Sequence, residues 1–257
     1  MSDIPARFRL DGRTALVTGA GRGIGRACAL ALAQAGAEVW LMARTRGEIE
    51  QAADEIRAAG SKAHTVVCDV TETQAMRNAI AAIPVLDVLV NNAGFNIPEP
   101  FVEVSEEHLD QLLALNVRAA FLVAQAAAQK MLESPERKSR GGAILHMSSQ
   151  MGHVGAPNRT VYCLTKHALE GLSKAMALEF ATHGIRVLSI APTFVETPLY
   201  RKMAERPEFA DWVRDRIPMG RVGQAEEVAA AVVFAASPGA SLMTGTSLTV
   251  DGGWTAQ

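Results

Sequence analysis

The chain has 257 residues, of which 49% are apolar and 20% are charged, and its formal net charge is −2. A near-neutral chain argues against nucleic acid as a partner, and its apolar content argues against disorder. No uninterrupted apolar run reaches the roughly 18 residues of a membrane span, and residues 1–8 lack the apolar stretch of a signal peptide. Cys28, Cys68 and Cys163 lie far apart, which predicts no metal site and no disulfide framework. We therefore expect a cytoplasmic protein with one hydrophobic core.

Short β-rich runs alternate with segments of helical period along the whole chain. Most of the runs carry apolar residues at consecutive positions, which is typical of parallel strands covered on both faces. A long helix is expected from about Ser105, which caps it, to Leu132. Strands are expected at 14–18, 38–43, 64–68, 85–90, 143–147, 186–190 and 247–250.

Alternating strands and helices with short connections predict right-handed crossovers and one doubly wound sheet. We expect an α/β fold with a single domain over 1–257. The stretch 134–142 carries charges of both signs and is predicted to be a solvated turn. The segment 194–219 lies between two core elements and is predicted to form a lid over the substrate.

A glycine-rich loop, written TGAGRGIG over residues 18–25, follows the first strand and precedes a helix. Glycine lets the backbone approach a ligand closely, and the free N–H groups at a helix start suit a pyrophosphate. The spacing Gly-x-x-x-Gly-x-Gly differs from the Gly-x-Gly-x-x-Gly of many dinucleotide folds, but the strand before it and the helix after it predict a dinucleotide site. The residues expected to contact the dinucleotide are Gly19, Gly21, Arg22, Gly23, Ile24 and Gly25.

The second strand ends at Ala43-Arg44, where a carboxylate would favour NAD. Arg44 and the nearby Arg22 suit a 2′-phosphate instead, because arginine grips phosphate with paired, charge-assisted hydrogen bonds. We therefore expect NADP as the cofactor, with NAD as the alternative.

Two further segments lie at the carboxyl ends of strands, where doubly wound sheets open their ligand crevice. Asp69, followed by Val70, could accept a hydrogen bond from the adenine amino group or cap the helix that begins near Glu72. The segment Asn92-Ala93-Gly94 is expected to line the cofactor, with its asparagines mainly stabilising the strand end.

Tyr162 and Lys166 are four residues apart in a segment of helical period, so their side chains share one helix face. An ammonium about 5 Å from the phenol would interact by roughly 3 kcal/mol at an effective dielectric of 20. We expect this to lower the phenol pKa by about 2 units, toward the working pH of a general acid.

Ser149 ends the fifth strand, and its hydroxyl could hydrogen-bond a substrate carbonyl beside the phenol. Asn116 lies inside the long helix, either as a satisfied core residue or as the anchor of a water that links Lys166 to solvent. Candidate substrate contacts are Asn96, Gln150, Met151 and Arg159.

Taken in order, TGAGRGIG, CDV, NNAG, the helical asparagine, SS, YCLTK and TVDGG resemble the short-chain dehydrogenase/reductase family over almost the whole chain. The resemblance implies a Rossmann-type sheet of seven parallel strands flanked by helices, and a homotetramer. It implies a catalytic tetrad of Asn116, Ser149, Tyr162 and Lys166, with Lys166 also holding the nicotinamide ribose. Pro192, Val195 and Thr197 would contact the nicotinamide, although Pro192 precedes Thr193 where the family usually has glycine.

The stretch PEFADWV followed by GRVG resembles gluconate 5-dehydrogenase-like, sugar- or polyol-oxidising members of this family. We therefore expect an NADP-dependent oxidoreductase that interconverts a secondary alcohol and a ketone on a sugar acid or polyol. Met151, Phe95 and Ile97 could equally form an apolar slot for a 3-oxoacyl thioester or keto-ester. A nucleotide-sensing binding protein that lost its chemistry is the non-enzymatic alternative.

Overall fold

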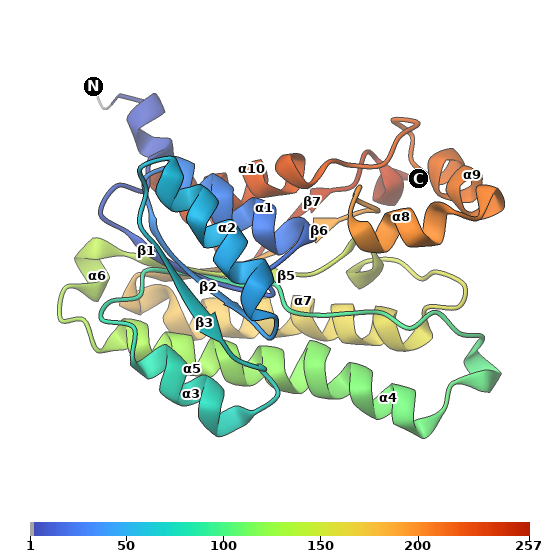
Figure 1. Cartoon of the computed structure of the whole chain (residues 1–257), viewed down its shortest axis with the longest axis horizontal. Coiled ribbons are helices and arrows are strands. Elements are labelled where there is room, and N and C mark those ends of the chain that lie inside the picture. The colour runs from blue at the N-terminus through green and yellow to red at the C-terminus, as the bar shows by residue number, and fades with distance from the viewer. Residues whose placement is uncertain (1–2) are drawn as a thin grey trace.

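The computed structural model, which describes residues 3–257, contains one sheet of seven parallel strands in the order β3-β2-β1-β4-β5-β6-β7 (Figure 1). The strand order reverses between β1 and β4, so the carboxyl ends of these two strands open a crevice at the switch point. This confirms the predicted doubly wound α/β sheet. The strands are β1 Thr14–Thr18, β2 Glu38–Ala43, β3 Ala63–Val67, β4 Val88–Asn91, β5 Gly142–Met147, β6 Ile185–Pro192 and β7 Ser247–Val250.

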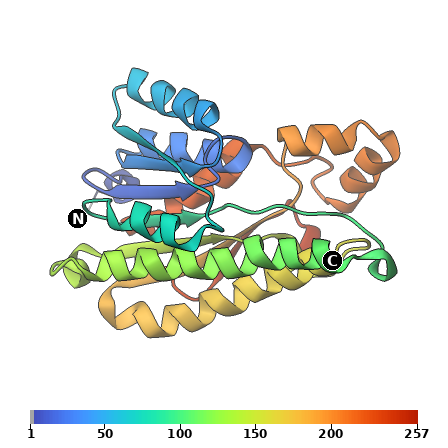
Figure 2. The ribbon, with the colours of Figure 1, turned by 60° about the horizontal axis from the view of Figure 1, so that its bottom comes forward.

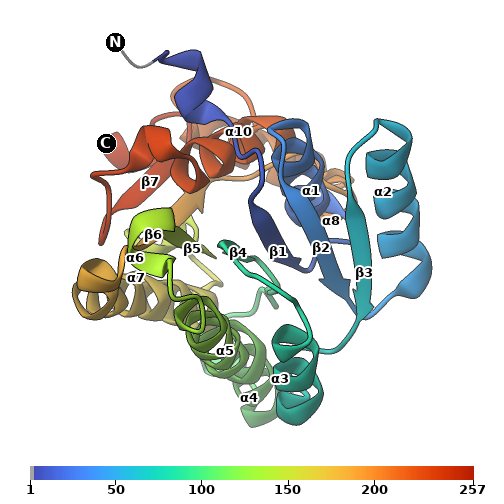
Figure 3. The same cartoon turned by 90° about the vertical axis from the view of Figure 1, so that its left-hand side faces the viewer.

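Helices cover both faces of the sheet, as the end-on view of Figure 3 shows. One layer holds α1 Gly23–Gln34, α2 Arg46–Ala58 and α10 Ala225–Ala236. The other holds α3 Thr73–Ala81, α5 Ala120–Leu132 and α7 Thr160–Phe180. Two further helices, α8 Pro198–Ala204 and α9 Pro207–Arg216, project at one end of the molecule (Figure 2).

The central strands are apolar on both faces because each face packs against a helical layer. In β1, Ala15 and Val17 belong to the core under α1 and α10, whereas Leu16 belongs to the core under α3 and α5. All three side chains are fully buried. Consecutive apolar residues therefore correspond to two separate cores, as the sequence pattern predicts.

The long helix runs from α4 Glu106–Leu113 through a π-helical turn, Ala114–Ala119, into α5. The hydroxyl of Ser105 accepts the N–H of His108 at 3.1 Å, which confirms the predicted cap. By length and composition, residues 106–132 could cross a membrane, although the sequence analysis expected no such segment. Half of the most apolar window is buried inside the molecule, as in the core helix of a globular domain.

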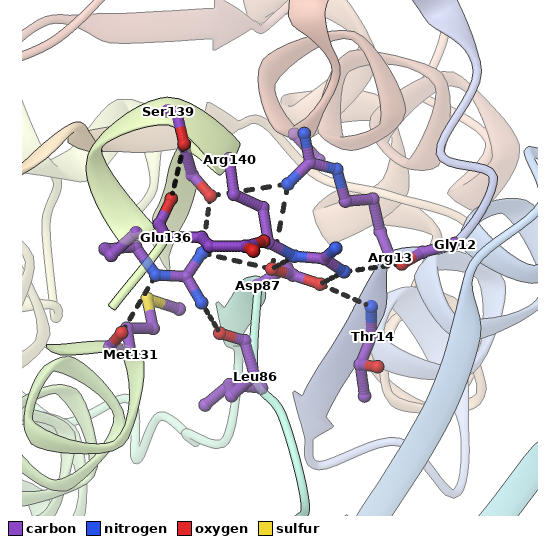
Figure 4. Close-up of polar contacts among 12 residues, drawn as sticks. Gly12, Arg13, Thr14, Leu86, Asp87, Met131, Glu136, Ser139 and Arg140 are labelled. Carbon is purple, nitrogen blue, oxygen red and sulfur yellow. Dashed lines mark hydrogen bonds and ion pairs between the residues drawn. The ribbon is translucent and has the colours of Figure 1, made fainter. Parts of the chain in front are cut away.

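The opposite, amino-terminal edge of the sheet is held by an ion-pair cluster around Asp87, whose carboxylate is 1% exposed (Figure 4). Arg137 donates to Asp87 at 3.0 Å, and Arg140 donates to both of its oxygens at 2.7 Å. The N–H of Thr14 donates to the same carboxylate at 3.0 Å. The prediction of a solvated turn over 134–142 is confirmed for the exposed residues 135, 136, 138 and 139. It was wrong for Arg137, which is 3% exposed and begins a short helix, α6 Arg137–Arg140.

Replacing Asp87 by asparagine tests how much this cluster stabilises the fold. Removing one member of a buried ion pair leaves the other charges uncompensated, so we expect the free energy of unfolding to fall by about 3–5 kcal/mol. Urea unfolding followed by circular dichroism measures the loss. Asp54→Asn is the control, because Asp54 is 74% exposed in its pair with Arg57 and should cost under about 1 kcal/mol. Equal effects of the two substitutions would contradict this role of Asp87.

The ion-pair cluster around Asp87 also makes the stability of the fold depend on pH at its acidic end. Although burial opposes the charged form, hydrogen bonds from Arg140, Thr14 and Arg137 hold the pKa of Asp87 below its ordinary value of 3.8. A carboxyl whose pKa is depressed by folding stabilises the protein above its unfolded pKa. The contribution is therefore complete at neutral pH and is lost as pH falls below about 3.8.

Candidate active site

The glycine-rich loop is braced from the neighbouring strand end. The Nδ2 of Asn92 donates to the carbonyls of Thr18 at 2.9 Å and Gly19 at 3.3 Å. In return, the hydroxyl of Thr18 accepts the N–H groups of Asn92 and Ala93 at 3.0 and 3.1 Å. These bonds confirm that Asn92 stabilises the strand end, and they hold the loop at the switch point.

Two positions of the loop require glycine, Gly25 for lack of space and Gly23 mainly for its positive φ. A Cβ at Gly25 would lie 2.5 Å from Asn92 Nδ2 and would clash with the carbonyl of Gly19. Gly23 has a φ of +55°, and a Cβ there would lie 3.3 Å from Thr197 Cγ2. Gly23 begins α1, and the preceding Arg22 provides no side-chain cap. The free N–H groups of this helix start therefore face a cradle that fits a pyrophosphate.

Charged residues gather near the end of β2. Arg44 and Arg22 have side chains that are 75% exposed, and Arg44 Nη1 lies 3.5 Å from Asp69 Oδ2. The carboxylate of Asp69 accepts the N–H of Thr71 at 2.9 Å and its hydroxyl at 2.7 Å. The alternative that Asp69 caps the next helix is wrong, since α3 begins after Glu72 and has no side-chain cap. Burial raises the pKa of Asp69, but the bonds from Thr71 and the charge of Arg44 outweigh it and leave this pKa below its ordinary value.

Asn116 is 1% exposed and lies in the π-helical turn that joins α4 to α5. Its Oδ1 accepts the N–H of Phe95 at 3.1 Å, and its Nδ2 donates to the Phe95 carbonyl at 2.8 Å and to Thr165 Oγ1 at 3.3 Å. The amide is therefore a satisfied core group, which was one of the two predicted alternatives. It also joins the segment after β4 to α7, and such π turns are frequent at functional sites.

Ser149, Tyr162 and Lys166 lie where β5 ends against α7. Lys166 is buried, and its Nζ donates to the carbonyl of Met147 at 2.8 Å and lies 5.3 Å from the centre of the Tyr162 ring. The hydroxyl of Ser149 donates to Gln150 Oε1 at 2.7 Å. A phenol, a hydroxyl and an ammonium at the carboxyl edge of the sheet can exchange a proton with a bound alcohol or ketone.

The segment after β6 lies beside this group. Thr197 caps α8 by accepting the N–H of Tyr200 at 3.2 Å, and Val195 pairs with Gly223. The Ser149 hydroxyl lies 3.5 Å from the carbonyl of Pro192. Thr197 also lies against Gly23, so this segment and the glycine loop face each other across the crevice.

The predicted substrate contacts fall into two groups. Gln150 and Met151 are buried in a short 3₁₀ turn after β5, and Asn96 has a buried Oδ1 without a partner in residues 3–257. Arg159 lines a separate cavity of about 510 Å³ between the start of α7 and α9. Four residues of the predicted lid segment 194–219 line the same cavity: Arg206, Glu208, Phe209 and Trp212.

Comparison with known proteins agrees with this geometry. A family model described as enoyl-(acyl carrier protein) reductase matches residues 19–255. The chain is 38% identical to bovine L-xylulose reductase over 97% of its length and 99% of the relative, and 39% identical to gluconate 5-dehydrogenase of Gluconobacter oxydans over 98% of both. A gluconate 5-dehydrogenase from Burkholderia cenocepacia, solved with NADP and tartrate, superposes with a TM-score of 0.93 at 36% identity, covering 99% of this chain and 100% of that one.

The chain belongs to the short-chain dehydrogenase/reductase family. Members of this family are NAD(P)-dependent oxidoreductases that act on CH–OH groups, and this chain is one of them. The chain spans nearly the full length of these relatives, so the resemblance covers both the glycine loop and the Tyr162 helix.

The pKa pattern of this short-chain dehydrogenase differs from the prediction. Burial raises the pKa of Tyr162 to about 12, opposed by the hydrogen-bonding hydroxyl of Ser149 and by the charge of Arg159. Burial also lowers the pKa of Lys166 to about 8, against the charge of Glu170. The predicted lowering of the phenol pKa is therefore wrong for this structure, because burial outweighs the hydrogen bond and the positive charge that favour the phenolate.

Gly25→Ala tests whether the glycine loop of this short-chain dehydrogenase holds the dinucleotide. The added methyl must displace Asn92 or the Gly19 carbonyl, so we expect the dinucleotide Kd to rise more than about tenfold, at 1.4 kcal/mol per tenfold. Fluorescence titration with reduced cofactor measures it. Gly47→Ala on α2 is the matched control, because a Cβ there has no neighbour within 4 Å. Unchanged affinity of Gly25→Ala would overturn the assignment.

Proposed function

We propose that this chain uses NADP(H) to interconvert a secondary alcohol and a ketone on a sugar acid or polyol. The observation that supports it best is the convergence of Ser149, Tyr162 and Lys166 at the sheet edge, across the crevice from the uncapped start of α1. The relatives named L-xylulose reductase and gluconate 5-dehydrogenase support a polyhydroxylated substrate.

Each residue of the proposed tetrad has a separate task. In reduction, the Tyr162 hydroxyl donates its proton to the carbonyl oxygen, and in oxidation its phenolate accepts the proton of the alcohol. Ser149 donates a hydrogen bond to the reacting oxygen, and Lys166 stabilises the phenolate by its charge. Asn116 fixes the position of the Phe95 backbone relative to α7 through its hydrogen bonds to both. NADP(H) supplies or accepts the hydride at the nicotinamide ring.

Tyr162→Phe tests the proton-transfer step. We expect kcat to fall at least about 100-fold, the usual contribution of a positioned acid or base, with the dinucleotide Kd unchanged. In the wild type, kcat for alcohol oxidation should rise with pH toward the phenol pKa, since the phenolate is the base, and the variant should lose this limb. A variant with wild-type turnover would contradict the role of Tyr162. Steady-state kinetics between pH 6 and about 10 measures both effects.

The preference for NADP is proposed from Arg44 and Arg22, which provide two exposed guanidinium groups near the end of β2, and from the NADP in the Burkholderia structure. The remaining proposed cofactor contacts are Gly19, Gly21, Gly23, Ile24, Gly25, Asp69, Val70, Asn92, Ala93, Gly94, Tyr162, Lys166, Pro192, Val195 and Thr197.

Arg44→Gln should lower kcat/KM with NADP about tenfold and leave NAD nearly unchanged, because it removes a charge-assisted bond to the 2′-phosphate. Arg46→Gln is the control, because Arg46 is an exposed arginine that begins α2, two residues after Arg44, and pairs with Glu50. Initial rates with both cofactors test this. A wild type that favours NAD would show the NADP assignment to be wrong.

Reduction of a 3-oxoacyl thioester is the second candidate reaction, supported by the description of the matching family model and by buried Met151. A nucleotide-sensing binding protein is disfavoured by the intact group of Asn116, Ser149, Tyr162 and Lys166. Turnover of acetoacetyl thioester beside sugar acids and polyols separates the two enzymes. Cofactor binding with no turnover on any of them would favour the sensor.

A homotetramer is proposed from the outer faces of α5 and α7, which lie side by side (Figure 2). Met176 is buried against the sheet, but Phe121, Leu164 and Leu178 are 48%, 52% and 83% exposed. Burying these side chains against a second copy removes apolar surface from water. Light scattering should give four chain masses, and a monomer would contradict the proposal. The three free cysteines support a reducing, cytoplasmic location, which cell fractionation tests.

A further inference from the structure

Arg159 is a buried cation without an acidic partner. Among residues 3–257, only two arginines are buried, and they are bonded differently. Arg137 has the carboxylate of Asp87 at 3.0 Å, whereas the guanidinium of Arg159 donates to one neutral acceptor, the carbonyl of Asn158, at 3.0 Å. No carboxylate in the described chain lies within 4.0 Å of Arg159, which is 8% exposed. An unpaired buried charge is costly, so a partner that arrives from outside would stabilise it.

The backbone around Arg159 holds this residue in place through a turn and three hydrogen bonds. Asn158 has a φ of +58°, the only positive φ of a residue other than glycine in the part of the chain described. Its carbonyl accepts both the Arg159 guanidinium and the N–H of Glu99 at 3.1 Å. The carbonyl of Arg159 accepts the N–H of Cys163 at 2.7 Å, so the residue is fastened to the first turn of α7. Asparagine adopts this left-handed conformation more readily than other residues with a side chain, so the turn suits Asn158 and fixes the position of Arg159.

The charge of Arg159 also interacts with the phenol of Tyr162. Burial lowers the pKa of Arg159, and the charges of Cys163 and Tyr162 oppose this effect. Arg159 immediately precedes α7 and Tyr162 lies in the first turn of that helix, so a substrate held at Arg159 can extend from the cavity to the phenol. The position therefore suits a part of the substrate that does not react.

The cavity at Arg159 has a charged and an aromatic wall. It has a volume of about 510 Å³, and the first turn of α9 contributes Arg206 and Glu208, both exposed. Phe209 and Trp212 line it further along α9. Two guanidinium groups against one carboxylate leave a net positive charge, which favours an anionic ligand. Within residues 3–257 Arg159 makes no cation–π contact, and the ring of Trp212 is instead covered by Arg216 of α9 at 5.4 Å.

We propose that Arg159 binds the carboxylate of an aldonate, an open-chain polyhydroxy acid, and makes this enzyme prefer acids to neutral polyols. The inference rests on the proposed alcohol oxidation at Tyr162. A guanidinium fits a carboxylate through two parallel hydrogen bonds, which orients the chain of hydroxyl groups toward the phenol. Arg206, on the opposite wall, adds a weaker and solvent-screened attraction.

Matched substrates separate charge recognition from general effects on catalysis. The wild type and Arg159→Met are assayed with NADP on D-gluconate and on D-gluconamide, which replaces the carboxylate by a neutral amide of nearly the same shape. We expect Arg159→Met to lower kcat/KM for gluconate about 30-fold or more, which corresponds to about 2 kcal/mol, and to change gluconamide less than about threefold. Arg159→Lys should restore part of the loss, since it keeps the charge but not the paired geometry.

Two more variants test the opposite wall of the cavity and provide a control on the same helix. Arg206→Gln, on the exposed wall, should lower kcat/KM for gluconate about threefold, in line with a screened charge. Arg214→Met is the control, because it lies on the same α9 but pairs with Asp211 and does not line the cavity. Dinucleotide affinity measured for every variant verifies that the glycine-loop site is intact.

The outcomes are distinct. Wild-type turnover of gluconamide as fast as gluconate overturns the inference and leaves the proposed function standing. Equal losses on both substrates in Arg159→Met, with a shifted pH profile, show that Arg159 acts on the Tyr162 pKa and also overturn it. If no sugar acid, amide or polyol is oxidised by the wild type, the proposed function itself fails.

Discussion

The hydrogen bonds between Asn92 and the end of β1 are the constraint on which the crevice depends. The strands β1 and β4 pair with each other, but the segments that follow them lead to helices on opposite faces of the sheet, so side-chain hydrogen bonds are needed to hold the two strand ends together beyond the ladder. The Thr18 hydroxyl accepts the backbone N–H of Asn92, and the side-chain amide of Asn92 donates to the Thr18 carbonyl. The same amide fills the space beside Gly25, which explains why the loop tolerates no side chain there.

The two edges of the sheet divide stability from function. At the amino edge, Asp87 is saturated with donors, and its arginines join the starts of β1, β4 and β5. At the carboxyl edge, Ser148 and Thr193 keep buried hydroxyls without partners among residues 3–257. Buried polar groups normally find partners, but within the described chain the ring nitrogens Nε1 of Trp40 and Nε2 of His146, on β2 and β5, are partnerless in the same way.

Burial dominates the electrostatics of the reacting group. It raises the pKa of Tyr162 to about 12 and lowers the pKa of Lys166 to about 8, so both groups shift toward their neutral forms, although the phenol is neutral and Lys166 is still mostly charged at neutral pH. His146, behind them on β5, is also held neutral, because burial lowers its pKa to about 4. The apolar core behind the site excludes water. Electrostatic interactions with a charged group that binds there are therefore stronger than they would be in water.

The sequence by itself determined the type and order of the strands and helices, because two-sided apolar runs and helical stripes are local patterns. It also determined which residues could act together, since Tyr162 and Lys166 share a helix face and the glycine loop follows a strand. Only the tertiary structure decided which charges are buried. Arg137 pairs with Asp87, which lies 50 residues away in the chain, whereas Arg159 is buried without an acidic partner in residues 3–257. Neither fact leaves a periodic pattern in the sequence. The direction of the Tyr162 pKa shift was likewise decided by burial, which depends on segments far apart in the chain.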